Sequence, residues 1–277
     1  MSALLALAAS LLWGSSDFGG GLMSRRLHPS AAVLISQSMA LLGLVLLLPL
    51  FQVPGGWYLA IAAGVGVVGT LSLASFYRAM ADAPLSLVAP ITAAGAAIPV
   101  LVGLARGAHL SVLQGAGILV TIIGVILASG PELRGDVRVR RQAVIFAVLA
   151  GAGFGVAYSL LPLAVADGNI YGTLLLQRIV GVVVLAPIVL RAGVLNGIRL
   201  GFKRLAALAA IGISDVVANA SYTLAASQGN LAVAAVLASL YPVVTALLAR
   251  GILAERLRPV QSMGVAAALG GVVLLST

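Results

Sequence analysis

The chain has 277 residues, of which 61% are hydrophobic and only 8% are charged. Soluble domains carry roughly 25% charged residues, so this composition excludes a soluble globular protein and indicates that lipid is the natural solvent. The excess of apolar residues also excludes intrinsic disorder. The absence of cysteine excludes disulfides, thiolate metal sites, iron–sulfur clusters and cysteine nucleophiles.

The formal net charge of +9 is compatible with nucleic-acid binding, but the sixteen Lys and Arg residues are scattered between apolar runs. Only Arg138, Arg140 and Arg141 form a cluster. Charges that flank membrane spans and set their topology explain all of these positions together. We therefore expect no nucleic-acid partner.

Ten apolar segments are long enough to cross a membrane as helices, since a spanning helix needs about 20 mostly apolar residues. Barrel strands would alternate apolar and polar residues, whereas runs such as 40–51 and 115–128 do not alternate, so helices are predicted. The first segment could instead be a signal peptide, but Arg25 and Arg26 follow it rather than precede it. The predicted spans are 3–23, 31–51, 57–78, 85–105, 111–129, 142–163, 170–190, 204–226, 231–250 and 260–276.

The two halves of the chain resemble each other at a nearly constant offset. Chance likeness between Ala- and Leu-rich helices is the alternative, but a shared Gln and a shared aromatic-Gly pair favour duplication. Matched pairs include Trp13 and Phe154, Gly14 and Gly155, Gln37 and Gln177, Gly66 and Gly212, and Gly124 and Gly271.

Five helices in each half is an odd number, so the second copy must enter the membrane from the opposite side. Inverted repeats are a common architecture of secondary transporters, with the substrate site between the halves. The predicted fold is therefore an all-α polytopic membrane protein. Its first five-helix repeat covers residues 1–130, a basic connecting loop covers 131–141, and the second repeat covers 142–277.

Positive charge is concentrated in the connectors at one face of this predicted bundle. The opposite face, which carries both termini, has Arg106 alone, and Arg178 lies inside a span. The positive-inside rule places the charged face in the cytoplasm and both termini outside, in an inner or plasma membrane. The cations of the charged face are Arg25, Arg26, Arg78, Arg134, Arg138, Arg140, Arg141, Arg191, Arg199, Lys203, Arg204, Arg250, Arg256 and Arg258.

Four short motifs carry a family likeness: Trp13-Gly14-Ser15-Ser16-Asp17-Phe18, Ala89-Pro90, Tyr241-Pro242-Val243-Val244 and Ala254-Glu255-Arg256-Leu257. With these the chain resembles, over its whole length, the ten-helix EamA family of the drug/metabolite transporter superfamily. The resemblance implies an exporter or exchanger of amino acids or other small metabolites. Two features depart from it. No Glu-Arg element follows the fourth span, where Arg106-Gly107-Ala108-His109 stands, and relatives commonly have cytoplasmic termini.

Three ionisable residues lie inside predicted spans, namely Asp17, Arg178 and Asp215. A charge at the centre of a spanning helix costs about 2.5–3.5 kcal/mol, so each of them needs a partner or a function. One interpretation is that Arg178 and Asp215 only neutralise each other as a buried pair. The other is that they line a hydrated cavity and bind a charged or zwitterionic substrate. Because Asp215 has a predicted partner, Asp17 is the better candidate for carrying a coupling proton.

Polar and aromatic side chains extend this candidate site. Asp215, Asn219 and Tyr222 share one helix face. Gln37 and Gln177 offer paired amides to a ligand, or bond to each other's helices. Rings including Phe154 would wall the pocket. The predicted substrate-binding residues are Trp13, Asp17, Gln37, Tyr158, Gln177, Arg178, Asp215, Asn219, Tyr222 and Tyr241.

Other residues have a predicted structural role. Gly151 and Gly155, four residues apart, are typical of close helix packing. Prolines within spans, among them Pro99 and Pro242, predict hinge points. Trp57 and Tyr77, near span ends, are expected in the interfacial aromatic belt.

The sequence thus predicts a secondary transporter that moves a small polar metabolite, such as an amino acid, outward by alternating access. The alternatives are a channel-like pore for small solutes, an exporter of cationic drugs, and a membrane enzyme acting on lipid. The chain lacks a catalytic constellation, metal-ligand spacing and a phosphate-binding loop, so we expect no enzyme, cofactor or metal. The expected partners are a small-molecule substrate, membrane lipid and protons.

Overall fold

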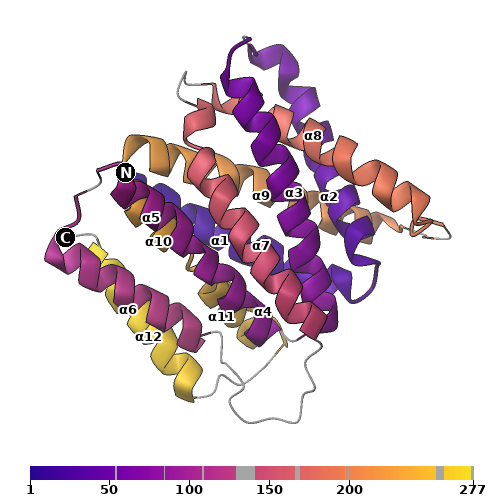
Figure 1. Cartoon of the computed structure of the whole chain (residues 1–277). Helices are drawn as coiled ribbons and strands as arrows, with labels where there is room; N and C mark the ends of the chain where they lie inside the picture. The colour runs from indigo at the N-terminus through magenta and orange to yellow at the C-terminus, as the bar shows by residue number, and fades with distance from the viewer. Residues whose placement is uncertain are drawn as a thin grey trace.

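The computed structural model describes residues 1–53, 55–83, 85–107, 109–128, 141–165, 169–196, 198, 200–253 and 259–275. These ranges consist of helices and short connections, with no strand among them, as Figure 1 shows. The helices, in chain order, are α1 (Ser2–Ser24), α2 (Pro29–Leu47), η1 (Leu48–Leu50), α3 (Tyr58–Asp82), α4 (Leu85–Ala93), η2 (Ala94–Ala96), α5 (Ala97–Ala105), α6 (Val112–Ala128), α7 (Arg141–Leu160), η3 (Leu163–Val165), α8 (Ile170–Arg191), α9 (Phe202–Gln228), α10 (Leu231–Ala238), α11 (Tyr241–Leu253) and α12 (Pro259–Leu275).

The all-helical membrane class is confirmed. Five helical segments of the described ranges are long and apolar enough to cross a membrane, and three shorter apolar helices accompany them. The exposed surface is rich in Leu, Ile and Val, which suits lipid as the surrounding solvent. The count of ten spans stays a prediction.

Local sequence signals fix several helix starts. Pro29 occupies the first turn of α2, where a missing N–H leaves no bond unmade. The side chain of Asn169 caps α8 by accepting a hydrogen bond of 2.7 Å from the backbone N–H of Gly172. Asn230 caps α10 in the same way through the N–H of Ala232, over 2.9 Å.

Two segments expected as single helices are each divided in the structure. The predicted span 85–105 becomes α4 and α5, joined by η2, and the span 231–250 becomes α10 and α11. Pro99 and Pro242 follow the two breaks and cannot donate the backbone hydrogen bond that would continue the preceding turn. The predicted hinges at these two prolines therefore coincide with real interruptions of helical structure.

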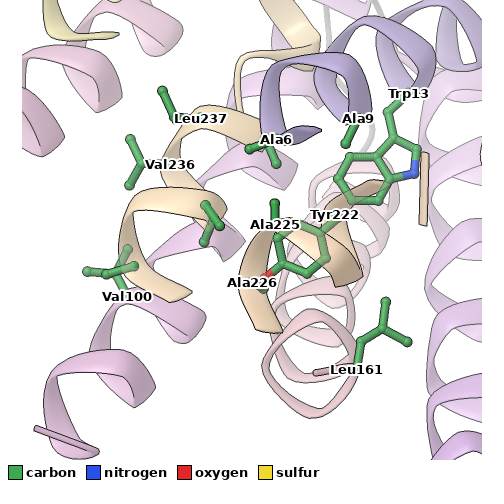
Figure 2. Packing of buried hydrophobic residues seen from close by; sticks show 14 of the residues in the cluster. Ala6, Ala9, Trp13, Val100, Leu161, Tyr222, Ala225, Ala226, Val236 and Leu237 are labelled. Carbon is green, nitrogen blue, oxygen red and sulfur yellow. The ribbon is translucent and has the colours of Figure 1, made fainter. Parts of the chain in front are cut away.

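Helices distant in the sequence pack against each other. In Figure 1, α1 crosses the bundle behind α7, and α6 and α12 lie side by side at its edge. α1 packs on α9, α10 and α11, while α3 packs on α7 and α8. Figure 2 shows part of the core between these helices, where Trp13 lies beside Tyr222, with Ala6 and Ala9 on the same helix as Trp13. This core fixes the positions of α1 and α9.

Glycines allow several of these helices to approach each other closely. A Cβ atom at Gly14 would lie 2.7 Å from the carbonyl oxygen of Tyr241. One at Gly151 would lie 3.0 Å from the carbonyl of Thr92, and one at Gly155 would lie 2.9 Å from the Cβ of Ile98. The packing role predicted for Gly151 and Gly155 is therefore confirmed.

The aromatic residues near span ends differ from expectation. Trp57 is exposed, which suits the interfacial belt, but Tyr77 is only 1% exposed. Its hydroxyl lies over Gly20 of α1, where a Cβ atom would collide with it. The interfacial prediction for Tyr77 is wrong, because glycine on the neighbouring helix opens a space that the ring fills.

Candidate functional site

An open cavity lies between the helices of the bundle, and its empty space, about 900 Å³, includes open solvent at its mouth. All ten residues predicted to bind substrate line it, although they come from six different helices. Trp13 and Asp17 are on α1, Gln37 on α2, Tyr158 on α7, Gln177 and Arg178 on α8, Asp215, Asn219 and Tyr222 on α9, and Tyr241 on α11. The structure thus brings the whole predicted set together.

The strongest polar contact in the cavity is the ion pair between Arg178 and Asp215. Nη2 of Arg178 lies 2.7 Å from Oδ2 of Asp215. Nη1 of Arg178 donates a second hydrogen bond, of 2.8 Å, to Oε1 of Gln37. Arg178 is only 6% exposed, so water does little to screen the pair. The two interpretations of these charges do not exclude each other, because the residues pair and also line the cavity.

The other carboxylate oxygen of Asp215 is held by neutral donors. Oδ1 of Asp215 accepts hydrogen bonds from Nε1 of Trp13, over 3.2 Å, and from Nδ2 of Asn219, over 3.1 Å. Asn219 follows Asp215 by one helical turn, as the shared face on α9 predicts. With Arg178 on one oxygen and two donors on the other, the orientation of this carboxylate is fixed from three sides.

Aromatic rings form a second wall of the cavity. The ring centroids of Trp13 and Tyr158 are 4.7 Å apart, and those of Tyr158 and Tyr222 are 5.2 Å apart. Phe154 stacks on Tyr158 at 5.7 Å with nearly parallel planes. Such rings offer a flat apolar surface and a negative face to a ligand.

A proline helps to order this wall. Pro162 has no N–H, so it cannot pair with the carbonyl of Tyr158 four residues earlier. The hydroxyl of Tyr222 donates to that carbonyl instead, over 3.1 Å. The bond satisfies a backbone group that would otherwise be left without a partner and connects α9 to α7.

Three buried polar groups of the cavity have no hydrogen-bond partner among the described residues. Nε of Arg178 and Nε2 of Gln177 are buried donors without an acceptor. Asp17 is 9% exposed, and its carboxylate accepts no hydrogen bond from the described part of the chain. Unsatisfied buried polar groups are uncommon in native proteins. Those at the cavity are therefore available to a ligand or to water.

Apart from Tyr241, sequence reasoning missed the side of the cavity that is formed by α3 and by the two broken helices. These residues are small or apolar and carry no chemical signal of their own. The internal repeat could have found part of this side, because adding 146 to Gly69 and Leu73 gives Asp215 and Asn219. The lining residues not predicted from the sequence include Val65, Gly66, Gly69, Thr70, Leu73, Thr92, Pro99, Ala235, Ala238 and Ser239.

Two predictions fall outside the described residues. The motif Ala254-Glu255-Arg256-Leu257 lies there, as does nearly all of the basic connecting loop over 131–141.

Comparison with known proteins identifies a family and a solved structure to which this chain is similar. Residues 141–277 match the model of the EamA-like transporter family. The comparison with curated proteins found no match. A solved structure described as "Crystal structure of protein" is similar to this chain with a TM-score of 0.76 and 16% sequence identity, over 99% of this chain and 98% of that chain. At this identity the likeness shows the fold alone, and it extends over almost the full length.

Proposed function

Because the chain belongs to the EamA-like transporter family of the drug/metabolite transporter superfamily, we propose that it moves a small polar metabolite outward across the plasma membrane by alternating access. The proposed cargo is an amino acid or a closely related compound. It binds in the cavity between α1, α3, α7, α8 and α9. The observation that supports this proposal best is the set of buried polar groups without partners along one cavity.

The free groups are complementary to a zwitterion. Nε of Arg178 and Nε2 of Gln177 are donors, so they suit the oxygens of a carboxylate. Asp17 is an acceptor, so it suits an ammonium group. An amino acid presents both groups on one carbon atom and could engage both sets of partners, with its side chain against the aromatic wall.

The charge of the cavity makes Asp17 the residue on which binding of a cation depends. The charged residues that line it are Asp17, Arg178 and Asp215. Arg178 is balanced by Asp215 at 2.7 Å, which leaves Asp17 without a cationic partner in a buried position. An ammonium group or a proton would neutralise its carboxylate. This is why the two are proposed to compete at Asp17 and why protons are the proposed coupling ion.

The packing of the helices supports two oppositely oriented repeats. A Cβ atom added at Gly124 on α6 would lie 2.8 Å from the carbonyl oxygen of Gly264 on α12. A Cβ atom added at Gly271 on α12 would lie 2.8 Å from the carbonyl oxygen of Gly117 on α6. Adding 147 to Gly117 and Gly124 gives Gly264 and Gly271. Exchanging the two halves of the chain therefore converts one contact into the other. Such reciprocity is expected of a two-fold axis between two copies, and transporters with inverted repeats bind substrate at that axis.

The interrupted helices support alternating access. Both breaks, at η2 and at Ser239, contribute residues to the cavity lining. Discontinuous helices next to a binding site are typical of secondary transporters. A rigid channel would not need them.

An exporter of organic cations is a second candidate, which one observation favours. Asp17, which has no cationic partner among the described residues, lines the same cavity as the rings of Trp13 and Tyr158. A cation with an apolar body fits such surroundings without any carboxylate. The two candidates differ in whether the ligand also engages Arg178 and Gln177.

Counterflow in proteoliposomes tests the proposal. Vesicles preloaded with unlabelled amino acid should take up the labelled compound faster than empty vesicles, with saturation. Uptake that is linear in concentration and unaffected by preloading would favour a pore and overturn the carrier mechanism. Three related probes separate the two ligand classes: an amino acid, its amine lacking the carboxylate, and its acid lacking the amine. We expect only the amino acid to compete well. Equal competition by the amine alone would favour the cation exporter.

The Asp17→Asn variant adds a matched test of the ammonium site. It keeps the size of the side chain and removes its charge, so binding of the amino acid should be lost while the fold is kept. Retained binding would overturn the assignment of Asp17. Ser75→Ala serves as the control, since Ser75 is half-buried, does not line the cavity, and bonds through its hydroxyl only to Leu71 of its own helix.

A further inference from the structure

Four glycines line the cavity, and close packing accounts for three of them. A Cβ atom at Gly66 would lie 2.9 Å from the backbone oxygen of Gln177 on α8. Gly95 and Gly155 lie against each other's helices, so that a Cβ atom on either would meet backbone atoms. At these three positions a side chain is excluded by neighbouring main chain.

Gly69 is different, because a Cβ atom added there would have no heavy atom within 4 Å. The residue lies near the middle of α3, where glycine is less favourable than alanine for a helix. No packing contact requires its lack of a side chain. Its neighbours on the same helix face, Val65 and Leu73, also line the cavity, so the empty space beside Gly69 is part of the cavity.

The internal repeat relates the open position at Gly69 to a charged position on α9. Gly69 and Asp215 differ by 146, the offset that also relates Gly66 and Gly212. On α9, the position carries the carboxylate that pairs with Arg178. On α3, the corresponding position carries no side chain. The ion pair therefore comes from α8 and α9, and α3 contributes no charged side chain opposite it. The side of the cavity near α3 is left open for the part of a ligand that does not bind to Arg178 or Asp215.

We propose that Gly69 sets the upper size limit of the ligand that this cavity accepts. The inference rests on the proposed function, since it assigns specificity within the same site. Larger residues at position 69 should exclude large ligands first and leave small ones bound.

The absence of cysteine from the chain allows a test that needs no ligand. Gly69→Cys introduces a single thiol, and Gly64→Cys is its control. Gly64 is on the same helix, is exposed and also has open space around it, but it does not line the cavity. In lipid nanodiscs, a charged methanethiosulfonate reagent should label Gly69→Cys and not Gly64→Cys, because thiolate formation requires water. Failure of Gly69→Cys to react, in protein that reacts fully once unfolded, would overturn the inference.

A size series tests the specificity directly. Gly69→Ala, Gly69→Val and Gly69→Leu are compared with Gly64→Leu, using thermal shift and counterflow with free glycine, leucine and tryptophan as probes. With Gly69→Leu, the affinity for tryptophan should fall by about tenfold to a hundredfold, the scale of overpacking, while that for glycine is unchanged. Gly69→Ala should raise the unfolding midpoint, because it favours the helix without a clash.

The possible results are distinguishable. If the wild-type protein binds none of the three probes, the proposed cargo is wrong, and the labelling experiment still decides whether position 69 faces a hydrated cavity. If the wild-type protein binds them and Gly69→Leu, correctly folded, keeps the wild-type ratio of affinities for tryptophan and glycine, the assignment of Gly69 is wrong. The same loss of tryptophan binding in Gly64→Leu would also overturn it.

Discussion

The indole nitrogen of Trp13 donates a hydrogen bond of 3.2 Å to the carboxylate of Asp215, a residue 202 positions later in the chain. The bond joins α1 to α9 and links the aromatic wall of the cavity to its ion pair. Trp13 is thus both a surface for apolar contact and a positioning group for a charge. The two roles can be separated by substitution.

Trp13→Phe should keep most of the ring contacts and remove the donor. Hydrogen bonds to charged groups contribute about 1.5–3 kcal/mol, so the unfolding midpoint should fall moderately. Trp13→Ala should lose the packing as well, at about 3–5 kcal/mol. Thermal unfolding in detergent measures both changes. Equal destabilisation by the two variants would mean that the hydrogen bond, rather than ring packing, dominates.

Removal of either partner of the Arg178–Asp215 pair should impair folding and transport. A buried charge left without its partner costs about 3–5 kcal/mol. Arg178→Met combined with Asp215→Leu should recover much of the stability, because apolar residues replace the pair. Counterflow by the double variant is the deciding measurement. Recovery of transport would show that the two charges only neutralise each other and do not bind substrate.

The ion pair between Arg78 and Asp82 is a less buried counterpart. Nη2 of Arg78 lies 3.1 Å from Oδ2 of Asp82, one turn later on α3, and the two side chains are 39% and 14% exposed. Fully exposed pairs contribute about 0–1 kcal/mol and buried pairs cost more to break. Arg78→Ala should therefore cost less stability than Arg178→Ala and leave transport close to the wild-type value.

The two cavity glutamines should respond differently to the same substitution. Gln37→Leu removes the acceptor of an Arg178 hydrogen bond and should destabilise the protein by about 1.5–3 kcal/mol. Gln177→Leu removes an amide whose Nε2 has no partner, so it should leave stability unchanged and weaken ligand binding. Unfolding and ligand titration are measured on both variants. If Gln177→Leu is as destabilising as Gln37→Leu, the Gln177 amide has a structural role.

Glycines at helix contacts should not tolerate even a methyl group. Gly14→Ala places a carbon atom 2.7 Å from the carbonyl of Tyr241, and overpacking of this kind costs about 1–3 kcal/mol. Gly43→Ala is the control, since nothing lies within 4 Å of an added Cβ there, and it should be neutral or stabilising. The difference in unfolding midpoint between the two variants measures the contact.

Much of the site could be predicted from the sequence, for a physical reason. Charged and amide groups such as Arg178 and Gln37 are costly in lipid, so they must face the interior of the bundle, and interior polar faces of several helices meet in one place. The helices themselves follow from long apolar runs. These two signals were enough to find ten residues of one cavity.

The remainder could not be read from residue types. Gly69 differs from Gly66 only in what surrounds it, and a list of glycines does not distinguish packing from open space. The burial of Tyr77 depends on Gly20 of another helix. The division of two helices was only partly signalled, because proline also occurs without a break, as at Pro187 inside α8.

The two interrupted helices have a mechanical consequence. A continuous helix resists bending through hydrogen bonds along its entire length, whereas a joint between two short helices lacks some of them. The bending stiffness of α4–α5 and α10–α11 is therefore lowest at the joints, which border the cavity. The wall of the cavity is therefore easiest to deform at these joints, and bending there costs less elastic energy than bending the same helices elsewhere.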